Sequence, residues 1–396
     1  MCLTEQGYIA MKNSVFTLML LMIYSSAYAE EAMIQGGEEE QLLKLSVGGR
    51  VFVDSAWYGD ANGIDLGDGS EVRNVRLNFG AAYRESLKLD LQVDYAGAVV
   101  SLKDVSLSYA FNDAVSIKLG NFEEPIGMES LASPSNYTFM ETAIQNAFNP
   151  GRRIGLGLKA VGENWTLETG GFDRKLTKHG VKDSSFDLGG RFTIAPLFDA
   201  EHLFHLGAAA IYSWPDKSNS LSYSRQPESH ITNARPVSTG TIANIDNYLT
   251  AGAEIAAATG PISMQGEYTH VTVRRLGLVD LHLQSFYIYT AWTITGEARK
   301  YLINKGKFGG ITPNSNLGEG GWGAVELAAR FSHLDLESRD IAGGVEDNMT
   351  LALNWYINPH ARIMANYIRA NVDRSPLSPT AGLSFNIYQL RMQLTF

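Results

Sequence analysis

Apolar and polar residues alternate along many short segments of this chain, and the alternation recurs to the last residue. The final segment, residues 388–396, reads Tyr-Gln-Leu-Arg-Met-Gln-Leu-Thr-Phe and alternates without a break. A period of two residues predicts a strand with one apolar and one polar face. Such a strand suits a barrel that is closed in lipid with its apolar side outward, and it also suits an ordinary core strand of a soluble sandwich.

The same pattern predicts sixteen strands, at residues 43–56, 72–84, 87–97, 102–111, 115–123, 152–162, 165–173, 185–196, 201–214, 247–259, 262–274, 281–297, 321–336, 347–358, 361–372 and 385–396. The second strand places Val75 and Leu77 on one face and Asn74 and Arg76 on the other. A ring of sixteen strands is too wide to fill with side chains, so its inside is wet and its outside apolar. We therefore predict an all-β fold, a 16-stranded antiparallel transmembrane β-barrel.

The connections between these strands alternate in length. Short turns are expected at 84–86, 112–113, 162–164, 259–261 and 358–360, and longer loops at 57–71, 124–151, 174–184, 215–246, 337–346 and 373–384. Short turns on one side of the membrane and long loops on the other are typical of outer-membrane barrels. Two connections depart from the rule, because 97–101 is short for a loop and 298–320 is long for a turn.

The N-terminal segment has the pattern of a secretory signal peptide. A basic start at 11–13 precedes a mostly apolar stretch at 15–23 and the small-residue cleavage site Ala27-Tyr28-Ala29. We expect residues 1–29 to be a signal peptide with an upstream extension, 30–42 a short lead-in and 43–396 the barrel. Cys2 is the only cysteine, so the mature chain has none.

Charge and motifs narrow the functional classes. The formal net charge of -10 argues against a nucleic-acid partner. The eight histidines show no recognisable metal spacing, and no Gly-x-Ser-x-Gly elbow is present. We therefore expect no enzyme, no cofactor and no catalytic or metal-binding residue. An outer-membrane enzyme and a plugged structural barrel remain as alternatives.

The loop at 124–151 is more apolar than an exposed loop, with Phe139, Ile144 and Phe148 among its residues. These side chains need a surface to pack on, and the nearest one in a wide barrel is the inner wall. The following strand places Gly155 and Gly157 on its inner face, where glycine leaves room for a backbone to lie close. We predict that this loop folds into the lumen and narrows it.

Several stretches resemble the phosphate-selective porin O/P family. They are Gly49-Arg50-Val-Phe-Val-Asp54, Val72-Arg73-Asn-Val-Arg76-Leu77, Gly120-Asn-Phe-Glu-Glu-Pro125, Phe139-Met140-Glu141, Pro150-Gly-Arg152-Arg153-Ile-Gly155, Thr295-Gly-Glu297, residues 323–332 and residues 354–359. The resemblance implies a homotrimeric porin in the outer membrane of a Gram-negative bacterium, surrounded by outer-membrane lipid. It also implies passive diffusion of small anionic solutes such as phosphate, and a constriction formed by the inward loop and other segments, for which 298–320 is a candidate.

An anion channel needs basic residues that face its lumen. Strand parity predicts the inward residues Arg50, Arg76, Lys118, Arg153, Lys159, Arg191, Arg330 and Arg391, and places Arg73 and Arg152 near strand ends, at the mouth of the constriction. For each of them, local pairing with an acid is the alternative. Glu326 lies four residues before Arg330 on the same face and is expected to neutralise it.

The sequence departs from the family at positions that bear on selectivity. Asn74 stands where many members have a second arginine, Glu123 and Glu124 precede Pro125, and Thr142 replaces a usual arginine. A tight phosphate site needs several convergent cationic donors. A weakly selective general-diffusion porin is therefore the alternative to a phosphate-selective one.

Overall fold

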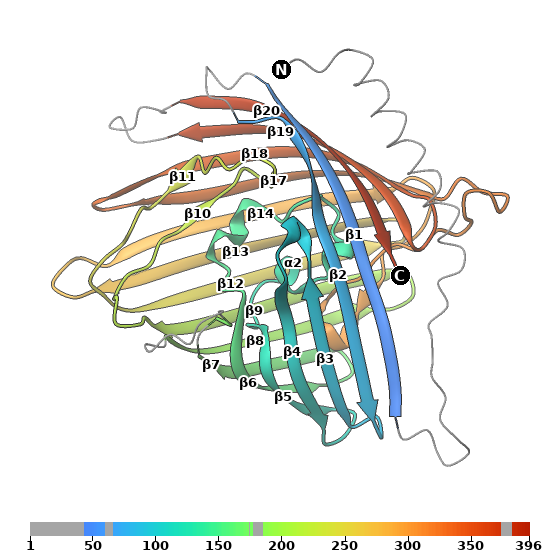
Figure 1. Cartoon of the computed structure of the whole chain (residues 1–396), viewed down its shortest axis with the longest axis horizontal. Coiled ribbons are helices and arrows are strands. Elements are labelled where there is room, and N and C mark those ends of the chain that lie inside the picture. The colour runs from blue at the N-terminus through green and yellow to red at the C-terminus, as the bar shows by residue number, and fades with distance from the viewer. Residues whose placement is uncertain (1–42, 60–65, 174, 177–184, 374–381) are drawn as a thin grey trace.

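The computed structural model describes residues 43–59, 66–173, 175–176, 185–373 and 382–396. Sixteen antiparallel strands form one closed barrel (Figure 1). They are β1 (Leu43–Gly59), β2 (Gly69–Tyr83), β3 (Leu87–Asp94), β4 (Ser101–Ala110), β5 (Val115–Glu123), β6 (Arg152–Val161), β7 (Trp165–Phe172), β8 (Phe186–Phe198), β9 (His202–Trp214), β12 (Ile245–Thr259), β13 (Ile262–Arg275), β14 (Leu281–Thr293), β17 (Ala324–Ser338), β18 (Ile341–Tyr356), β19 (Ala361–Asp373) and β20 (Leu383–Thr395). The predicted fold and strand number are confirmed.

The alternation of the sequence maps onto the two faces of the wall. On β18, Leu351 and Leu353 point outward and are 57% and 46% exposed, whereas Thr350 and Asn354 point inward and are buried. No helix among the described residues is long and apolar enough to span a bilayer.

The two ends of the barrel differ in their connections. We call the end with residues 84–86, 111–114, 162–164, 199–201 and 260–261 the turn end, and the opposite end, with residues 124–151 and 215–244, the loop end. The prediction of a loop at 337–346 is wrong. β17 and β18 continue to a turn at Arg339 and Asp340, and Ser338 pairs with Ile341. Cross-strand pairing thus extends a stretch whose polar and glycine residues indicated a loop.

The first and last strands close the barrel. β1 pairs with β20 from Arg50 opposite Thr395 to Gly59 opposite Asn386. At the turn end, the Gly49 amide donates to the Phe396 carbonyl at 2.8 Å, and the Phe396 amide donates to the Gly49 carbonyl at 3.0 Å. A Cβ on Gly49 would lie 2.5 Å from the Phe396 ring and 2.7 Å from the Arg76 carbonyl oxygen. Only glycine fits this approach without a shift.

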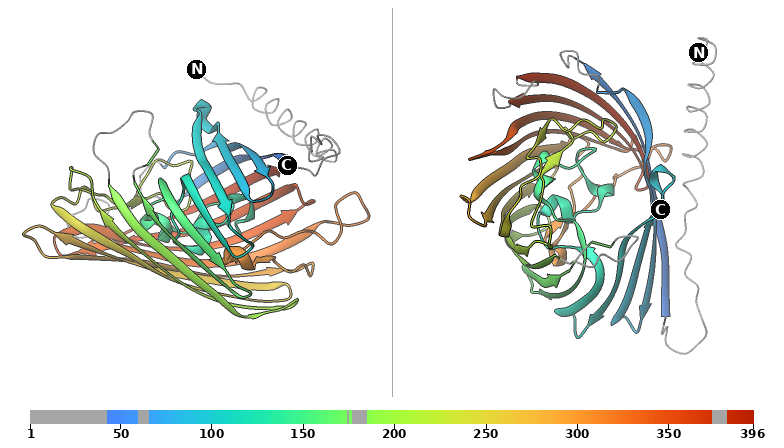
Figure 2. Two further views of the ribbon diagram at one scale, coloured as in Figure 1. Left: turned by 90° about the horizontal axis from the view of Figure 1, so that it is seen from below. Right: turned by 60° about the vertical axis from the view of Figure 1, so that its left-hand side comes forward.

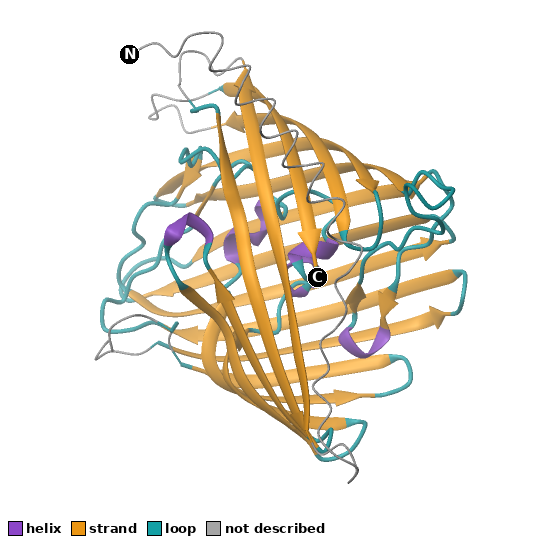
Figure 3. Ribbon diagram, turned by 45° about the vertical axis from the view of Figure 1, so that its right-hand side comes forward, coloured by secondary structure: helices purple, strands orange, loops and turns teal. Residues whose placement is uncertain are grey.

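Parts of three connections lie inside the ring of strands (Figure 2). The first, residues 124–151, carries α2 (Met128–Leu131), η3 (Pro134–Asn136) and η4 (Ile144–Phe148). The second, residues 215–244, carries β10 (Ser224–Arg225) and β11 (Val237–Ser238). The third, residues 294–323, joins β14 to β17 at the turn end and carries β15 (Tyr301–Leu302), η5 (Ile303–Lys305) and β16 (Lys307–Phe308). Figure 3 shows the short helices of the chain in purple and the strands of the wall in orange.

Candidate functional site

Two consecutive ion pairs close the base of the first inward segment. β5 ends at Glu123 and β6 begins at Arg152, and these two residues are opposite one another. Arg152 lies 2.7 Å from Glu123 and 2.6 Å from Asp104, and Arg153 lies 2.7 Å from Glu124. The acids that depart from the family pattern therefore contact the two arginines at the other end of the segment.

Arg153 is enclosed by carboxylates. Its side chain is 10% exposed, and Glu124 and Asp187 lie 2.7 and 2.9 Å from the same Nε atom. Burial, together with repulsion from Asp187, raises the pKa of Glu124 to about 9 despite the nearby guanidinium. Arg153 thus lies against two buried acids that also contact one another, which is a structural task.

A β-bulge turns Arg73 into the lumen. Phe52 pairs with Asn74 and Val53 with Val72, so Arg73 has no partner on β1. An extra residue of this kind re-aims its side chain. Its guanidinium binds Glu141 at 2.8 and 3.0 Å. Burial acts to raise the pKa of the Glu141 carboxyl, but Arg73 and Arg391 hold it well below its usual range.

Arg391 and Arg330 attach inward segments to the wall. Arg391 binds Asp54 at 2.6 Å and Glu141 at 2.9 Å, and it also donates to the Met140 carbonyl. Arg330 binds Glu228 at 2.6 Å and Glu129 at 3.2 Å. Both guanidinium groups are buried, so they hold residues 124–151 and 215–244 in place and do not face an open path.

The expected pairing of Glu326 with Arg330 is wrong. Glu326 instead binds Arg299 of the third inward segment at 2.6 Å and accepts a hydrogen bond from Asn354 at 2.8 Å. Arg330 binds acids of the two inward segments 124–151 and 215–244, and strand parity cannot predict where the acids of these segments lie.

The remaining predicted arginines are also buried. Arg191 binds Glu254 at 2.6 Å and donates to the Gly306 carbonyl at 2.6 Å, which fixes the third inward segment. Arg76 binds Asp94 at 3.0 Å. Arg50 donates to Asn74 at 2.7 Å and to Ser133 at 3.2 Å, with no carboxylate in salt-bridge contact in the described part of the chain. All three lie on the inner side.

One side of the lumen remains open. A cavity of about 440 Å³ lies against the inner faces of β3 to β7, towards the turn end. Five lysines line it, namely Lys88, Lys118, Lys159, Lys305 and Lys307, together with three acids, Asp104, Glu123 and Glu168. Arg152 and Arg73, whose side chains are 25% and 27% exposed, are the least buried predicted arginines.

The lysines differ from the arginines in their partners. Lys159 binds Glu168 at 2.6 Å. Lys118 lies over the Phe122 ring at 5.2 Å, and Lys307 donates to the Leu131 carbonyl. Within the described residues, only Lys159 of the five is in a salt bridge, so four ammonium groups are available to a passing anion. Burial and the neighbouring Lys305 lower the pKa of Lys307 to about 8.

The structure thus divides the ten predicted residues. It brings Lys118 and Lys159 to the open cavity and engages every predicted arginine except Arg50 in an ion pair. Three cavity lysines, Lys88, Lys305 and Lys307, were not predicted. The signal for the last two is the Lys-Gly-Lys run within 298–320, the connection whose length is unusual. No group of three or more potential metal ligands occurs among the described residues.

Comparison with known proteins gives a family and a fold. The model of the phosphate-selective porin O and P family matches residues 45–396. Porin O of Pseudomonas aeruginosa is 23% identical over 379 residues, covering 84% of each chain. An uncharacterized protein of Caulobacter vibrioides is 27% identical over 335 residues, 81% of this chain and 67% of that protein. The structure of an anion-selective porin from Comamonas acidovorans superposes with a TM-score of 0.59 at 14% identity, over 89% of this chain and 100% of that one.

Proposed function

Since the chain belongs to the phosphate-selective porin O and P family, we propose that it is an outer-membrane porin with a weak preference for small anions. The observation that carries the proposal is the cavity with five lysines and three acids, four of whose lysines have no salt-bridge partner among the described residues. A channel of this kind works by shape and field, and it needs no catalytic group.

We further propose that the path does not contain a tight phosphate site. Such a site needs several cationic donors that converge on one anion. Eight of the ten arginines and lysines predicted to face the lumen are in ion pairs, and Arg50 donates to Asn74 and Ser133. Only Lys118 of the ten is left without a carboxylate or a hydrogen-bond acceptor among the described residues, and it lies over the Phe122 ring. The lysine-lined half of the lumen therefore attracts anions by its field, without a rigid set of donors.

The working unit is proposed to be a homotrimer, with one channel in each copy and outer-membrane lipid around the assembly. One structural neighbour, an outer-membrane protein of Vibrio cholerae, is described in a trimer form. Cross-linking of the protein in intact outer membranes tests this assembly. A product no larger than a dimer at saturating cross-linker would contradict it.

Bilayer conductance tests the channel function. The protein is inserted into planar bilayers, and the reversal potential is measured across gradients of potassium chloride and of potassium phosphate. We expect channel steps and a reversal potential on the anion side for both salts, with little difference between chloride and phosphate. Cation preference would refute the anion assignment, and the absence of steps would refute the channel.

A matched pair of variants tests the path itself. Lys118→Gln removes a cavity charge that no carboxylate pairs, whereas Lys44→Gln removes a lysine outside the cavity, 48% exposed and bound to Glu85. The first change should lower anion preference and the second should leave it unaltered. Equal effects would place the ion path elsewhere.

A further inference from the structure

Two histidines lie side by side on the outward face of the wall. His270 is on β13 and His282 is on β14, and the two strands are joined by the connection at residues 276–280. Thr272 is opposite His282 and Gln284 is opposite His270, so the two imidazoles are diagonal neighbours across the strand pair. They are 12 residues apart in the sequence, and the hairpin brings them together. We call His270 and His282 the histidine pair.

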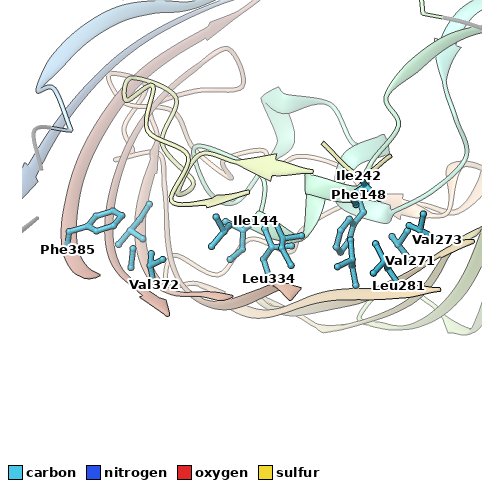
Figure 4. Packing of buried hydrophobic residues seen from close by; sticks show 14 of the residues in the cluster. Ile144, Phe148, Ile242, Val271, Val273, Leu281, Leu334, Val372 and Phe385 are labelled. Atoms are coloured by element: carbon cyan, nitrogen blue, oxygen red, sulfur yellow. The ribbon is translucent and has the colours of Figure 1, made fainter. Parts of the chain in front are cut away.

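The histidine pair is reached from outside the barrel and stands apart from the ion path. His282 is exposed and His270 is half-buried. Inward neighbours on the same strands, such as Val271 and Leu281, have no exposed area. They belong to a closed hydrophobic core that includes Phe148 of the first inward segment (Figure 4). The core holds the strand pair from its inner side, so the backbone that carries both imidazoles is fixed.

The two rings face each other through nitrogen atoms. Nε2 of His270 lies 3.4 Å from Nδ1 of His282, whereas a hydrogen bond from an N–H group is ordinarily about 2.7–3.2 Å long. Two imidazole nitrogens bound to one tetrahedral zinc ion, each at about 2.05 Å, are about 3.3–3.4 Å apart. Bonds of that length at right angles, as in square-planar copper, would leave them only about 2.9 Å apart. The observed separation is therefore that of two ligands on one tetrahedral ion.

A tyrosine favours one tautomer of the first histidine. The Tyr268 ring stacks beside the His270 ring at 6.5 Å, and the His282 ring follows at 5.5 Å. The Tyr268 hydroxyl donates to the side-chain oxygen of Gln284 at 3.2 Å, which leaves its own oxygen as an acceptor for Nδ1 of His270, 3.4 Å away. The proton is thereby favoured on Nδ1, and Nε2 keeps a free lone pair towards His282. A metal-binding imidazole usually donates through its other nitrogen in this way.

We propose that the histidine pair binds a zinc ion through Nε2 of His270 and Nδ1 of His282, with water in the remaining positions. Imidazole suits zinc, copper and nickel, whereas calcium and magnesium prefer oxygen ligands. The tetrahedral separation of the two nitrogens selects zinc among the first three. The Thr272 hydroxyl, 3.5 Å from the same Nδ1, lies beside the site.

The site also explains why the sequence indicated no metal-binding residue. That expectation rested on the spacing of histidines along the chain, as in a helical motif. A pair formed across a hairpin has no fixed spacing, because the distance along the chain depends on the length of the connection. The register of β13 and β14 is what identifies it.

Calorimetric titration with zinc chloride tests the site on protein purified from outer membranes without a polyhistidine tag. We expect one zinc ion per chain in the wild type. Loss of an orienting partner alone weakens metal binding about 10–100-fold, so His270→Gln and His282→Gln should each weaken it by at least about tenfold. His202→Gln is the matched control, because His202 is also exposed and lies beside Asp199, at 3.2 Å. Its affinity should equal that of the wild type.

Thermal unfolding gives a second measurement. Zinc held by two strands stabilises only the folded barrel, so it should raise the temperature at which gel mobility changes in the wild type and in His202→Gln, but not in His270→Gln. Absence of zinc binding by the wild type would overturn the proposal. Wild-type affinity in both variants of the histidine pair would also overturn it, since zinc would then bind elsewhere, and an equal loss in His202→Gln would show general adsorption by exposed histidines. Unchanged single-channel conductance of each variant shows that the barrel is folded.

Discussion

Lys307 gives the channel a pH dependence that can be worked out from the structure. Its ammonium group lines the cavity, and its pKa is lowered to about 8 by burial and by Lys305. It is therefore about 90% protonated at pH 7 and about 10% protonated at pH 9. Across this interval the balance of five lysines and three acids in the cavity falls by nearly one positive charge. Anion preference must decrease as the pH rises.

The size of the change follows from the Coulomb energy. A unit charge about 10 Å from a permeating ion contributes about 0.4 kcal/mol at the dielectric constant of water, and about half of that after salt screening. The effect has opposite signs for anions and cations. The ratio of anion to cation permeability should therefore fall about two- to threefold between pH 7 and pH 9.

Reversal potentials across a fixed salt gradient, measured at several pH values, give this ratio. Lys307→Gln should show the low ratio at pH 7 and lose the step near pH 8. Lys300→Gln is the matched control, because Lys300 is exposed in the same connection and does not line the cavity. If Lys307→Gln retains the full step, the titrating group is another one and the reasoning is refuted.

Three further predictions concern the contacts that fix the inward segments. Arg153→Ala leaves the buried acids Glu124 and Asp187 without their cation, so thermal unfolding should show a loss of about 3–5 kcal/mol. Arg73→Gln should shift the reversal potential with a smaller loss of stability, and equal losses would contradict the distinction. Glu228→Ala removes the partner of Arg330 and should lower the free energy of unfolding by about 3–5 kcal/mol. The released segment 215–244 should raise single-channel conductance, with Glu228→Gln as the milder control, and unchanged conductance would contradict this role. Gly49→Ala should reduce the folded fraction seen by heat-modified gel mobility, at a cost of about 1–3 kcal/mol, and normal folding would show that the Phe396 ring can move away.

The barrel was predictable because the alternation of apolar and polar residues that specifies its strands is local in the sequence. Alternation with a period of two residues fixes which residues face out, and β5 was predicted with its observed bounds, Val115–Glu123. The exception at 337–346 has a physical cause. That segment is polar and glycine-rich, and its strand character comes from cross-strand pairing.

The site was less predictable because its contacts join distant parts of the chain. Glu228 reaches Arg330 across the lumen, and Arg299 reaches Glu326 from a different connection. Parity shows that an arginine faces inward and does not show which acid an inward loop brings to it. Arg73 is a related case, since the bulge that re-aims it is a feature of the register.

The seam between β1 and β20 has a consequence for how the molecule is made. Arg50 pairs with Thr395, so the two edges that meet are among the most distant segments of the barrel in sequence. Until β20 has emerged, β1 presents a row of unpaired amide and carbonyl groups, and such an edge readily pairs with other chains. Closure of so long a loop is also a late and slow event in folding. The edge of β1 in a nascent chain therefore stays unpaired throughout synthesis and export. The chain avoids aggregation only where this edge is kept away from other copies.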